Sequence, residues 1–419
     1  MAWLEKIHHP ETYIKMFLKW GFLGLLMGSL GGVLGAVFHH ALHFVTHLRS
    51  EHMWLVFLLP LGGLATVAIY RLLKLQGNKG TNEIIDAALD GKEVSPFVAV
   101  AIFLSAGITH LLGGSAGREG AALQLGGSTA SLLARIFRLK DQERRILIMA
   151  GMSAVFAGLF GTPLTAMLFC MEFESVGTLF TPALLPCFLA SYTASRVSGM
   201  MGVHAEGYLL ERILPITLGN SWRLLVLAVL ISVLGIAMCA VFHKAEHLAK
   251  DRIPNPWVRI AAGGAVITVL TLLVGDHRFN GAGMDMALAA VRGEADWYSF
   301  ALKMLFTAVT LAAGFKGGEI VPTFCIGATF GCVLGGLLGL EPGICGALGL
   351  VGLFCCATNS PLASIVLSIE MFGSANLYPF ALVCVICFVL SGHSGLYASQ
   401  IMCFSKVSES GDLRRKDNQ

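Results

Sequence analysis

One carboxylate stands in a stretch of sequence that carries few charges. Glu119 lies in the segment GGSAGREGAALQLGG, next to Arg118 and at the start of an apolar run. A carboxylate at membrane depth is costly to bury and marks function by default. At a helix N-terminus it would occupy a place suited to an anion, and protonation would neutralise it and let it leave. We therefore predict that Glu119 is both a gate and a proton carrier; the alternative is a charge that stabilises the helix dipole and pairs with Arg118.

Four other polar residues lie within or beside apolar segments. Lys316 and Glu319, in GFKGGEIVPTF, could form a local ion pair. Lys79 could attract anions at the mouth of a pathway or extend its ammonium group to the membrane interface. Tyr397, in GHSGLYASQ, could direct its hydroxyl at an anion, although an isolated buried Tyr more often packs with one hydrogen bond.

Histidine and cysteine are numerous, but their spacing does not favour a metal centre. His39, His43 and His47 fall at i, i+4 and i+8 on one helix face, with no matching carboxylate or Cys cluster. We interpret them as the interfacial end of a helix, with a metal stripe as the alternative. Most of the eleven Cys lie inside apolar runs, where they serve as small buried hydrophobes. We predict no metal and no cofactor.

The composition limits the kind of protein that positions these residues. Apolar residues make up 55% of the 419 residues and charged residues 13%, against about 25% charged in soluble domains. Gly accounts for 49 residues, which favours close helix packing. Disorder needs more charge, and a net charge of +3 provides no basic face for nucleic acid. The apolar runs are continuous and too long for barrel strands. The pattern predicts an all-α polytopic membrane protein.

The charged ends of the chain predict its orientation. Lys6, Lys15 and Lys19 lie near the N-terminus, and the segment 406–416 is basic as well. Cytoplasmic flanks of membrane proteins are enriched in Lys and Arg, so we expect both termini in the cytoplasm and an even number of crossings. The first residues do not resemble a signal peptide, because no short apolar region with a cleavage site follows.

The two halves of the chain repeat each other. Three matched motifs pair Gly80 with Gly283, Glu119 with Glu319 and Pro163 with Pro361, at offsets of 203, 200 and 198 residues. A steady offset over three motifs indicates a true internal repeat. Several apolar segments are short or interrupted by Gly, which is typical of discontinuous helices around a binding site.

The loops after the second motif indicate that the repeats are inverted. The segment 135–145 carries five basic residues, whereas its counterpart 334–346 carries none. The positive-inside rule places the two loops on opposite faces of the membrane. Inverted repeats are an architecture of transporters and channels, with a site at the midplane where the halves meet. Gly before each helix would let several N-termini converge on an anion there.

Glu172 and Glu370 end the third pair of motifs, each nine residues after its Pro. Because they occupy equivalent positions, we predict that they cap or link helix ends rather than carry protons.

The repeat divides the chain into five segments. They are a cytoplasmic N-terminus at 1–15, a first membrane repeat at 16–200, a linker at 201–221, a second and inverted repeat at 222–404, and a cytoplasmic tail at 405–419.

Together these motifs resemble the CLC family of anion channels and proton-coupled antiporters. The segment 117–120 (GREG) is similar to its gating-glutamate motif, and 317–324 (GGEIVPTF) to its G-x-F-x-P motif. The segment 77–81 (GNKGT) stands in the place of its G-S-G-x-P motif, and Tyr397 matches its late anion-facing Tyr. The resemblance covers residues 16–404 and implies a CLC-type fold. It leaves no room for the CBS domains of many eukaryotic members.

Departures from the family pattern point to one branch. Lys79 stands where the family has its central Ser, and Phe173 where many chloride exchangers have an inner Glu. Ile320 replaces the usual Phe, and Ala121 the usual Pro. These features are similar to the fluoride/proton antiporters. The resemblance then implies a homodimer in a bacterial plasma membrane that exports fluoride as protons enter.

The resemblance also implies a set of site residues. Glu119 would be the gate and proton carrier. The anion would meet Lys79, Gly80, Thr81, Arg118, Gly120, Ile320, Val321 and Tyr397. A chloride/proton exchanger or a passive chloride channel of the same fold is the alternative. We expect no enzyme, because neither an H-E-x-x-H motif nor a helix-opening G-x-S-x-G motif occurs.

Overall fold

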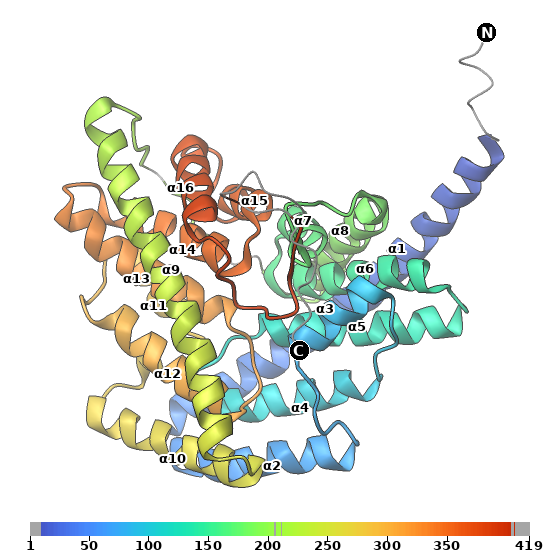
Figure 1. Cartoon of the computed structure of the whole chain (residues 1–419), viewed down its shortest axis with the longest axis horizontal. Coiled ribbons are helices and arrows are strands. Elements are labelled where there is room, and N and C mark those ends of the chain that lie inside the picture. The colour runs from blue at the N-terminus through green and yellow to red at the C-terminus, as the bar shows by residue number, and fades with distance from the viewer. Residues whose placement is uncertain (1–9, 205–206, 211, 404–405, 407–419) are drawn as a thin grey trace.

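The computed structural model describes residues 10–204, 207–210, 212–403 and 406. Lys6 and the basic segment 414–416, which predicted cytoplasmic termini, lie outside these residues. The described chain is almost entirely helical (Figure 1). Besides the α-helices it contains three short 3-10 helices, at Met53–Leu58, Thr181–Ala183 and His277–Phe279. Strand β1 (Ser175–Val176) pairs in parallel with β2 (Ile401–Met402).

Eight α-helices form the first half of the part of the chain that the structure describes. They are α1 (Pro10–Glu51), α2 (Leu59–Leu72), α3 (Thr81–Asp90), α4 (Phe97–Leu111), α5 (Glu119–Ile136), α6 (Asp141–Phe160), α7 (Pro163–Glu172) and α8 (Leu184–Met200).

Eight α-helices also form the second half. They are α9 (Leu218–Arg252), α10 (Pro256–Val274), α11 (Met284–Val291), α12 (Ser299–Ala313), α13 (Ile320–Leu337), α14 (Pro342–Thr358), α15 (Pro361–Phe372) and α16 (Leu377–Leu390). They match the first eight in order, so the predicted internal repeat is confirmed. In Figure 1 the two longest helices, α1 and α9, enter from the upper right and the upper left.

Several helices are too short to cross a membrane alone. Within the described residues, five helical segments have the length and apolar composition of a crossing, and α4, α7, α12 and α14–α16 are shorter. At about 1.5 Å per residue, a ten-residue helix spans only half of a hydrocarbon core of about 30 Å. The prediction of discontinuous helices is therefore confirmed.

Two long apolar stretches are each divided between two helices in the structure. The stretch 146–171 divides into α6 and α7, and 343–370 divides into α14 and α15. Gly161 and Asn359 end the first helix of each pair with a positive φ, at 71° and 57°. A Pro opens the next helix each time, where its missing N–H costs nothing.

Glycine contacts hold the equivalent helix pairs together. A Cβ atom on Gly126 of α5 would lie 2.2 Å from the carbonyl oxygen of Gly151 in α6. In the second half, a Cβ atom on Gly327 of α13 would lie 2.3 Å from the carbonyl oxygen of Gly349 in α14. Only Gly allows the helices to approach so closely, and the same contact recurs in both halves.

Reciprocal carboxylate caps tie the halves together. Glu172, the last residue of α7, accepts backbone hydrogen bonds of 3.1 and 2.9 Å from the second and third residues of α15. Glu370 of α15 accepts the equivalent bonds, at 2.9 and 2.8 Å, from the second and third residues of α7. These bonds satisfy N–H groups that a helix start leaves without partners. The prediction that both residues link helix ends is confirmed.

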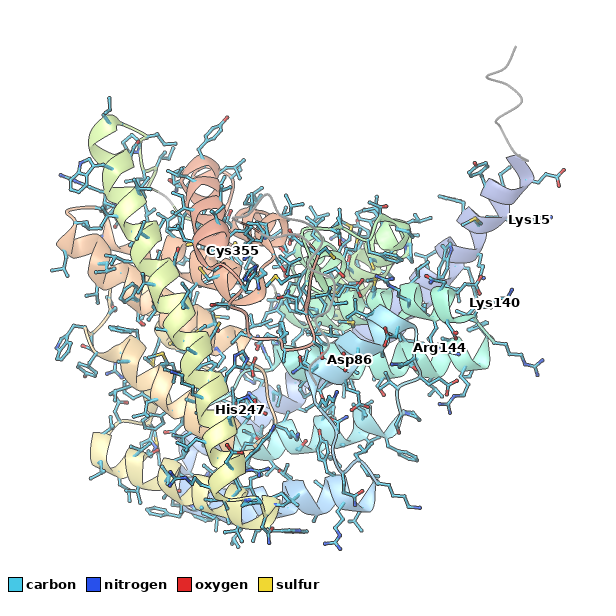
Figure 2. All side chains as sticks on the ribbon, in the orientation of Figure 1. Lys15, Asp86, Lys140, Arg144, His247 and Cys355 are labelled. Carbon is cyan, nitrogen blue, oxygen red and sulfur yellow. The ribbon has the colours of Figure 1, made fainter. Side chains whose placement is uncertain are left out.

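Basic residues near the start of α1 and α6 lie on one side of the molecule. Figure 2 places Lys15, Lys140 and Arg144 together at the right of the view. Lys19 of α1 forms an ion pair with Glu143 of α6. The N-terminal helix and the basic loop that the positive-inside rule assigned to one face are therefore neighbours.

Most of the cysteine side chains are buried, as the sequence predicts. All eleven Cys are free, and every one except the partly exposed Cys403 is buried. Within the described residues, no group of three or more His, Cys, Asp or Glu has an arrangement that could hold a metal ion.

Removing one reciprocal cap should destabilise the protein. In Glu172→Ala, the N–H groups of Leu362 and of the buried Ala363 at the start of α15 lose their acceptor, which costs roughly 1–3 kcal/mol. We expect a lower apparent unfolding temperature for the purified protein in detergent. Glu294→Ala, which changes an exposed carboxylate, is the matched control. An equal effect of the two substitutions would contradict the capping role.

Candidate functional site

Two loops from opposite halves pair at the centre of the molecule. Gly117 and Gly318 form an isolated antiparallel bridge, in which each N–H donates to the other carbonyl oxygen at 2.7 Å. Gly117 lies just before α5, and Gly318 just before α13. The bridge therefore holds the N-termini of α5 and α13 side by side, and their free N–H groups create a shared region of positive potential.

The Glu119 carboxyl group occupies this region. Its side chain is fully buried, and Oε1 accepts a hydrogen bond of 3.1 Å from the backbone N–H of Arg118. The backbone amides of Glu119 itself and of Val321 also face the carboxyl group. Oε2 has no hydrogen-bond partner within the part of the chain that the structure describes. The carboxylate thus sits in an amide cradle from both halves, but it is only partly bonded there.

The backbone beneath the carboxyl group must be glycine. A Cβ atom on Gly318 would lie 2.4 Å from Oε2 of Glu119, and one on Gly117 would lie 2.3 Å from the same oxygen. Real Cβ atoms do not approach oxygen so closely. Glycine at both positions therefore creates the space that the carboxyl group fills.

A third helix N-terminus joins the cradle. Gly80 precedes α3 with a φ of +64°, a conformation that favours Gly. Gln124 of α5 donates to the carbonyl oxygen of Gly120 at 3.1 Å and to Oγ1 of Thr81 at 3.4 Å. These contacts fix the start of α3 against the first turn of α5. The sequence analysis did not identify Gln124, which is buried within the apolar helix that follows Glu119.

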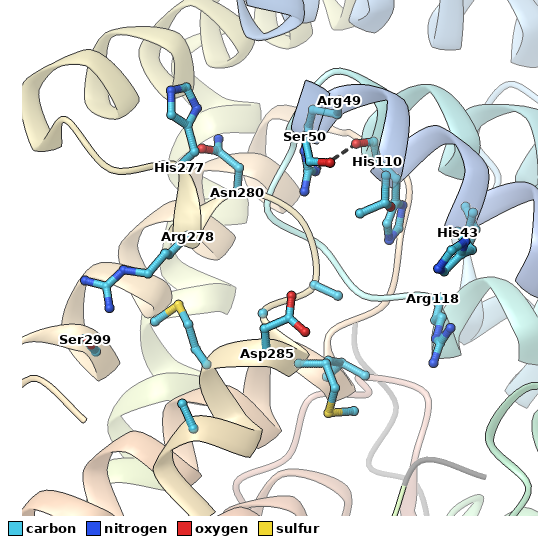
Figure 3. Close-up of a pocket in the computed structure, with 18 of the residues that line it drawn as sticks. His43, Arg49, Ser50, His110, Arg118, His277, Arg278, Asn280, Asp285 and Ser299 are labelled. Atoms are coloured by element: carbon cyan, nitrogen blue, oxygen red, sulfur yellow. Dashed lines mark hydrogen bonds between the residues drawn. The ribbon is translucent and has the colours of Figure 1, made fainter. Parts of the chain in front are cut away.

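Two cavities lie on either side of the cradle. The larger one, of about 1540 Å³, is lined by five of the predicted residues: Lys79, Gly80, Thr81, Gly120 and Tyr397. The smaller one, of about 740 Å³, is lined by Arg118 and Val321 (Figure 3). Glu119 lines neither cavity, and its sequence neighbours line different ones. Its carboxyl group therefore lies in the barrier between them.

The predicted residues differ in how closely they approach the barrier. Ile320 is the buried first residue of α13. Tyr397 is 7% exposed and packs edge-on against Phe173, with ring centroids 5.6 Å apart. Lys79 has a side chain that is 69% exposed and pairs with Asp86 at 3.6 Å, so it lies at the mouth of the larger cavity.

Arg118 and Lys316 contact aromatic rings. The Arg118 guanidinium lies 5.0 Å from the centroid of the Phe160 ring, and its Nη1 donates to Nδ1 of His39 at 3.2 Å. The Lys316 ammonium lies 4.6 Å from the centroid of the Tyr70 ring. Among the described residues, Lys316 forms no ion pair with Glu319, so that interpretation of the sequence was wrong.

Sequence analysis also missed Lys303, a fully buried cation on α12. Its ammonium donates to Oγ of Ser115 at 3.0 Å, to the carbonyl oxygen of Phe279 at 3.1 Å and to that of Gly281 at 2.6 Å. These bonds attach the loop before α11 to the loop before α5. A single Lys within the apolar segment SFALKMLFTAVT was the available signal, since a charge at membrane depth marks function by default.

Comparison with known proteins identifies the family. Residues 62–392 match the family model described as voltage gated chloride channel. The chain belongs to the CLC family. The crystal structure of a CLC-type fluoride/proton antiporter superposes on it with a TM-score of 0.89 and 32% identity, and the match covers 92% of this chain and 98% of that one.

Curated relatives extend the comparison. The chloride/fluoride channel protein of Pseudomonas syringae pv. tomato is 34% identical over 416 residues, which cover 96% of this chain and 91% of the relative. The H(+)/Cl(-) exchange transporter ClcA of Vibrio campbellii is 26% identical over 419 residues, covering 88% and 87%. The CLC protein described here is thus a multi-pass membrane protein of a family of anion channels and exchangers.

Crowding the barrier should impair anion movement. Gly318→Ala places a methyl group against Oε2 of Glu119 and the backbone of Gly120, so either the carboxyl group or the loop pairing must shift. We expect anion flux in liposomes to fall roughly ten- to hundredfold, since small misplacements at a functional site are costly. Gly107→Ala, at a helical site with open space around it, is the control and should retain flux. Normal flux in Gly318→Ala would show that the contact is not needed.

Proposed function

We propose that this CLC protein exports fluoride in exchange for protons, with Glu119 as gate and proton carrier. One observation supports this above all: the Glu119 carboxylate occupies an amide cradle between two cavities, in the place where an anion would bind. The solved CLC-type fluoride/proton antiporter favours fluoride, and the Pseudomonas relative is named for both chloride and fluoride.

In the proposed mechanism, the ionised carboxyl group and the anion compete for the same amides. When Glu119 is ionised, it fills the cradle and separates the cavities. When it is protonated, it loses the charge that the helix N-termini favour and leaves. An anion then enters the cradle, where preoriented N–H donors hold it without a fixed positive side chain. Because carboxylate and anion exclude each other, each anion transfer is linked to protonation of Glu119.

A second carboxyl group is placed to pass the proton onward. Glu319 precedes α13 and lines the larger cavity, and its charge acts on that of Glu119. Phe173, which stands where many chloride exchangers of the family have an inner Glu, is fully buried and packs against Phe169 with ring centroids 4.7 Å apart. A proton route through the position of Phe173 would therefore be apolar. We propose that Glu319 exchanges protons between Glu119 and the larger cavity.

The orientation and assembly form part of the proposal. The larger cavity would face the cytoplasm of a bacterial plasma membrane, and the smaller cavity would face outward. Both termini would be cytoplasmic, with repeats at 16–200 and 222–404 and a linker between them. We propose a homodimer with a separate pathway in each subunit.

A flux assay tests the function directly. Purified protein in liposomes is given matched fluoride and chloride gradients, and anion efflux and proton uptake are recorded together. We expect fluoride efflux with coupled proton uptake and little chloride movement. Coupled chloride movement would favour the exchanger alternative, which the Vibrio relative represents. Chloride movement without protons would make the chain a channel.

Neutralising the gate should uncouple the two ions. Glu119→Gln keeps the shape of the side chain but cannot ionise, so proton uptake driven by fluoride should fall to background in the same assay. Glu93→Gln, which changes a carboxylate in a surface ion pair with Arg135, is the control and should keep coupling. Intact coupling in Glu119→Gln would exclude Glu119 as the proton carrier.

Glu319→Gln should slow proton movement without closing the anion path. Proton transfer by a positioned group contributes roughly 10²–10⁴-fold, so we expect proton uptake to fall by at least about tenfold. Fluoride binding, measured by calorimetry, should remain because the amide cradle is unchanged. If proton uptake stays at the native rate, the proton follows another route.

A further inference from the structure

The smaller cavity contains a cluster of three nitrogen-bearing side chains on one side of the amide cradle. Arg49, His110 and Arg118 all line it (Figure 3). Figure 3 shows the His110 ring in the space between Arg49 and Arg118. Val321, whose amide faces Glu119, lines the same cavity, so an ion that leaves the cradle on this side meets the cluster.

His110 has one ring nitrogen without a partner. Its Nδ1 lies 2.8 Å from the carbonyl oxygen of Ala106. A carbonyl oxygen only accepts hydrogen bonds, so Nδ1 carries a hydrogen. Nε2 is buried and has no hydrogen-bond partner among the described residues, and the side chain is 4% exposed. An unpaired polar atom in such a place is costly unless a ligand completes it.

The charges around His110 come from several elements. The positive charges of Arg49, Arg118 and Lys303 act on the ring. Other titratable residues at this cavity are His39, His43 and His47 of α1, His277 and Arg278 of the 3-10 helix His277–Phe279, and Asp285, Glu294 and Asp296. Asp285 acts on Arg49. The three cations nearest the ring therefore oppose a proton on His110 until a negative charge joins them.

Two of these cations are already fixed by the protein. Arg49 donates from Nη1 to the carbonyl oxygen of His110 at 2.8 Å, and its guanidinium leaves no room for a Cβ on Gly281. Lys303 uses its ammonium on three oxygen atoms. Arg49 and Lys303 therefore place positive charge beside the His110 ring, but neither forms a hydrogen bond with Nε2.

We propose that the smaller cavity binds a small inorganic anion at His110, and that the anion and a proton bind there together. The neutral ring presents a lone pair at Nε2, which repels an anion. The protonated ring presents an N–H donor, which forms a charge-assisted hydrogen bond. The anion in turn offsets the repulsion from Arg49, Arg118 and Lys303. Anion and proton affinities are then coupled, and the coupling is reciprocal.

At the His110 site, the anion and the proton of the proposed exchange would bind next to each other. Its identification as a fluoride site rests on the proposed function, whereas the pairing of anion and proton does not. It differs from the cradle because a histidine side chain supplies its donor, whereas backbone amides supply the donors at Glu119.

Calorimetry on the purified full-length protein in detergent tests the site, with sodium fluoride as the probe. Titrations at about pH 5.5 and about pH 7.5 bracket the usual histidine pKa of about 6.5. We expect an additional binding event at the acid pH that weakens at least about tenfold at the higher pH. His110→Asn should lose this event. His43→Asn, which changes an exposed histidine at the same cavity, should retain it.

Nuclear magnetic resonance of the native protein with ¹⁵N-labelled histidine provides a second measurement that needs no stable variant. Fluoride should raise the pH midpoint of one buried histidine, because the anion prefers its protonated form. A histidine midpoint that neither sodium fluoride nor sodium chloride moves, or binding of both salts that is identical at the two pH values, would overturn the proposal.

The outcomes separate this site from the proposed function. If sodium chloride moves the midpoint and sodium fluoride does not, the anion–proton pairing holds and the fluoride assignment fails. If liposomes show fluoride/proton exchange while no histidine responds to either salt, the exchange stands and the His110 site fails.

Discussion

The amide cradle around Glu119 depends on the two hydrogen bonds that join Gly117 to Gly318. They bring together two helix N-termini that lie about two hundred residues apart in the sequence. Each helix start presents unpaired N–H groups. Two starts side by side form the amide cradle, which favours negative charge without a cationic side chain. The absence of Cβ atoms at these glycines leaves room for the Glu119 carboxyl group, which occupies the amide cradle.

Buried helix starts require acceptors, and this CLC protein satisfies them in two ways. Glu172 and Glu370 each bind two backbone N–H groups with both carboxylate oxygens, and each comes from the end of a helix that is itself fixed. Glu119 has one unbonded oxygen and belongs to the helix that it covers. The same chemistry therefore gives permanent caps in one place and, in our proposal, a displaceable one in the other.

Cations are distributed around the barrier rather than within it. Lys79 lies at the mouth of the larger cavity, whereas Arg49 and Arg118 line the smaller one and the charge of Lys303 acts on His110 there. A fixed cation in the cradle would bind an anion too firmly for release, while cations at a distance attract anions and leave the cradle to neutral amides. This distribution fits a pathway for small anions.

The sequence alone determined the membrane class, the internal repeat, the family resemblance and the place of Glu119 at the start of a helix, because these depend on local composition and on motifs that recur at a fixed offset. The linking role of Glu172 and Glu370 followed from their equivalence. Only the tertiary structure decided which groups meet across the halves. Lys303, Gln124 and the unpaired nitrogen of His110 gain their meaning from contacts between distant segments, which no local pattern encodes. The breaks at Gly161 and Asn359 likewise depended on helix ends finding acceptors in the other half.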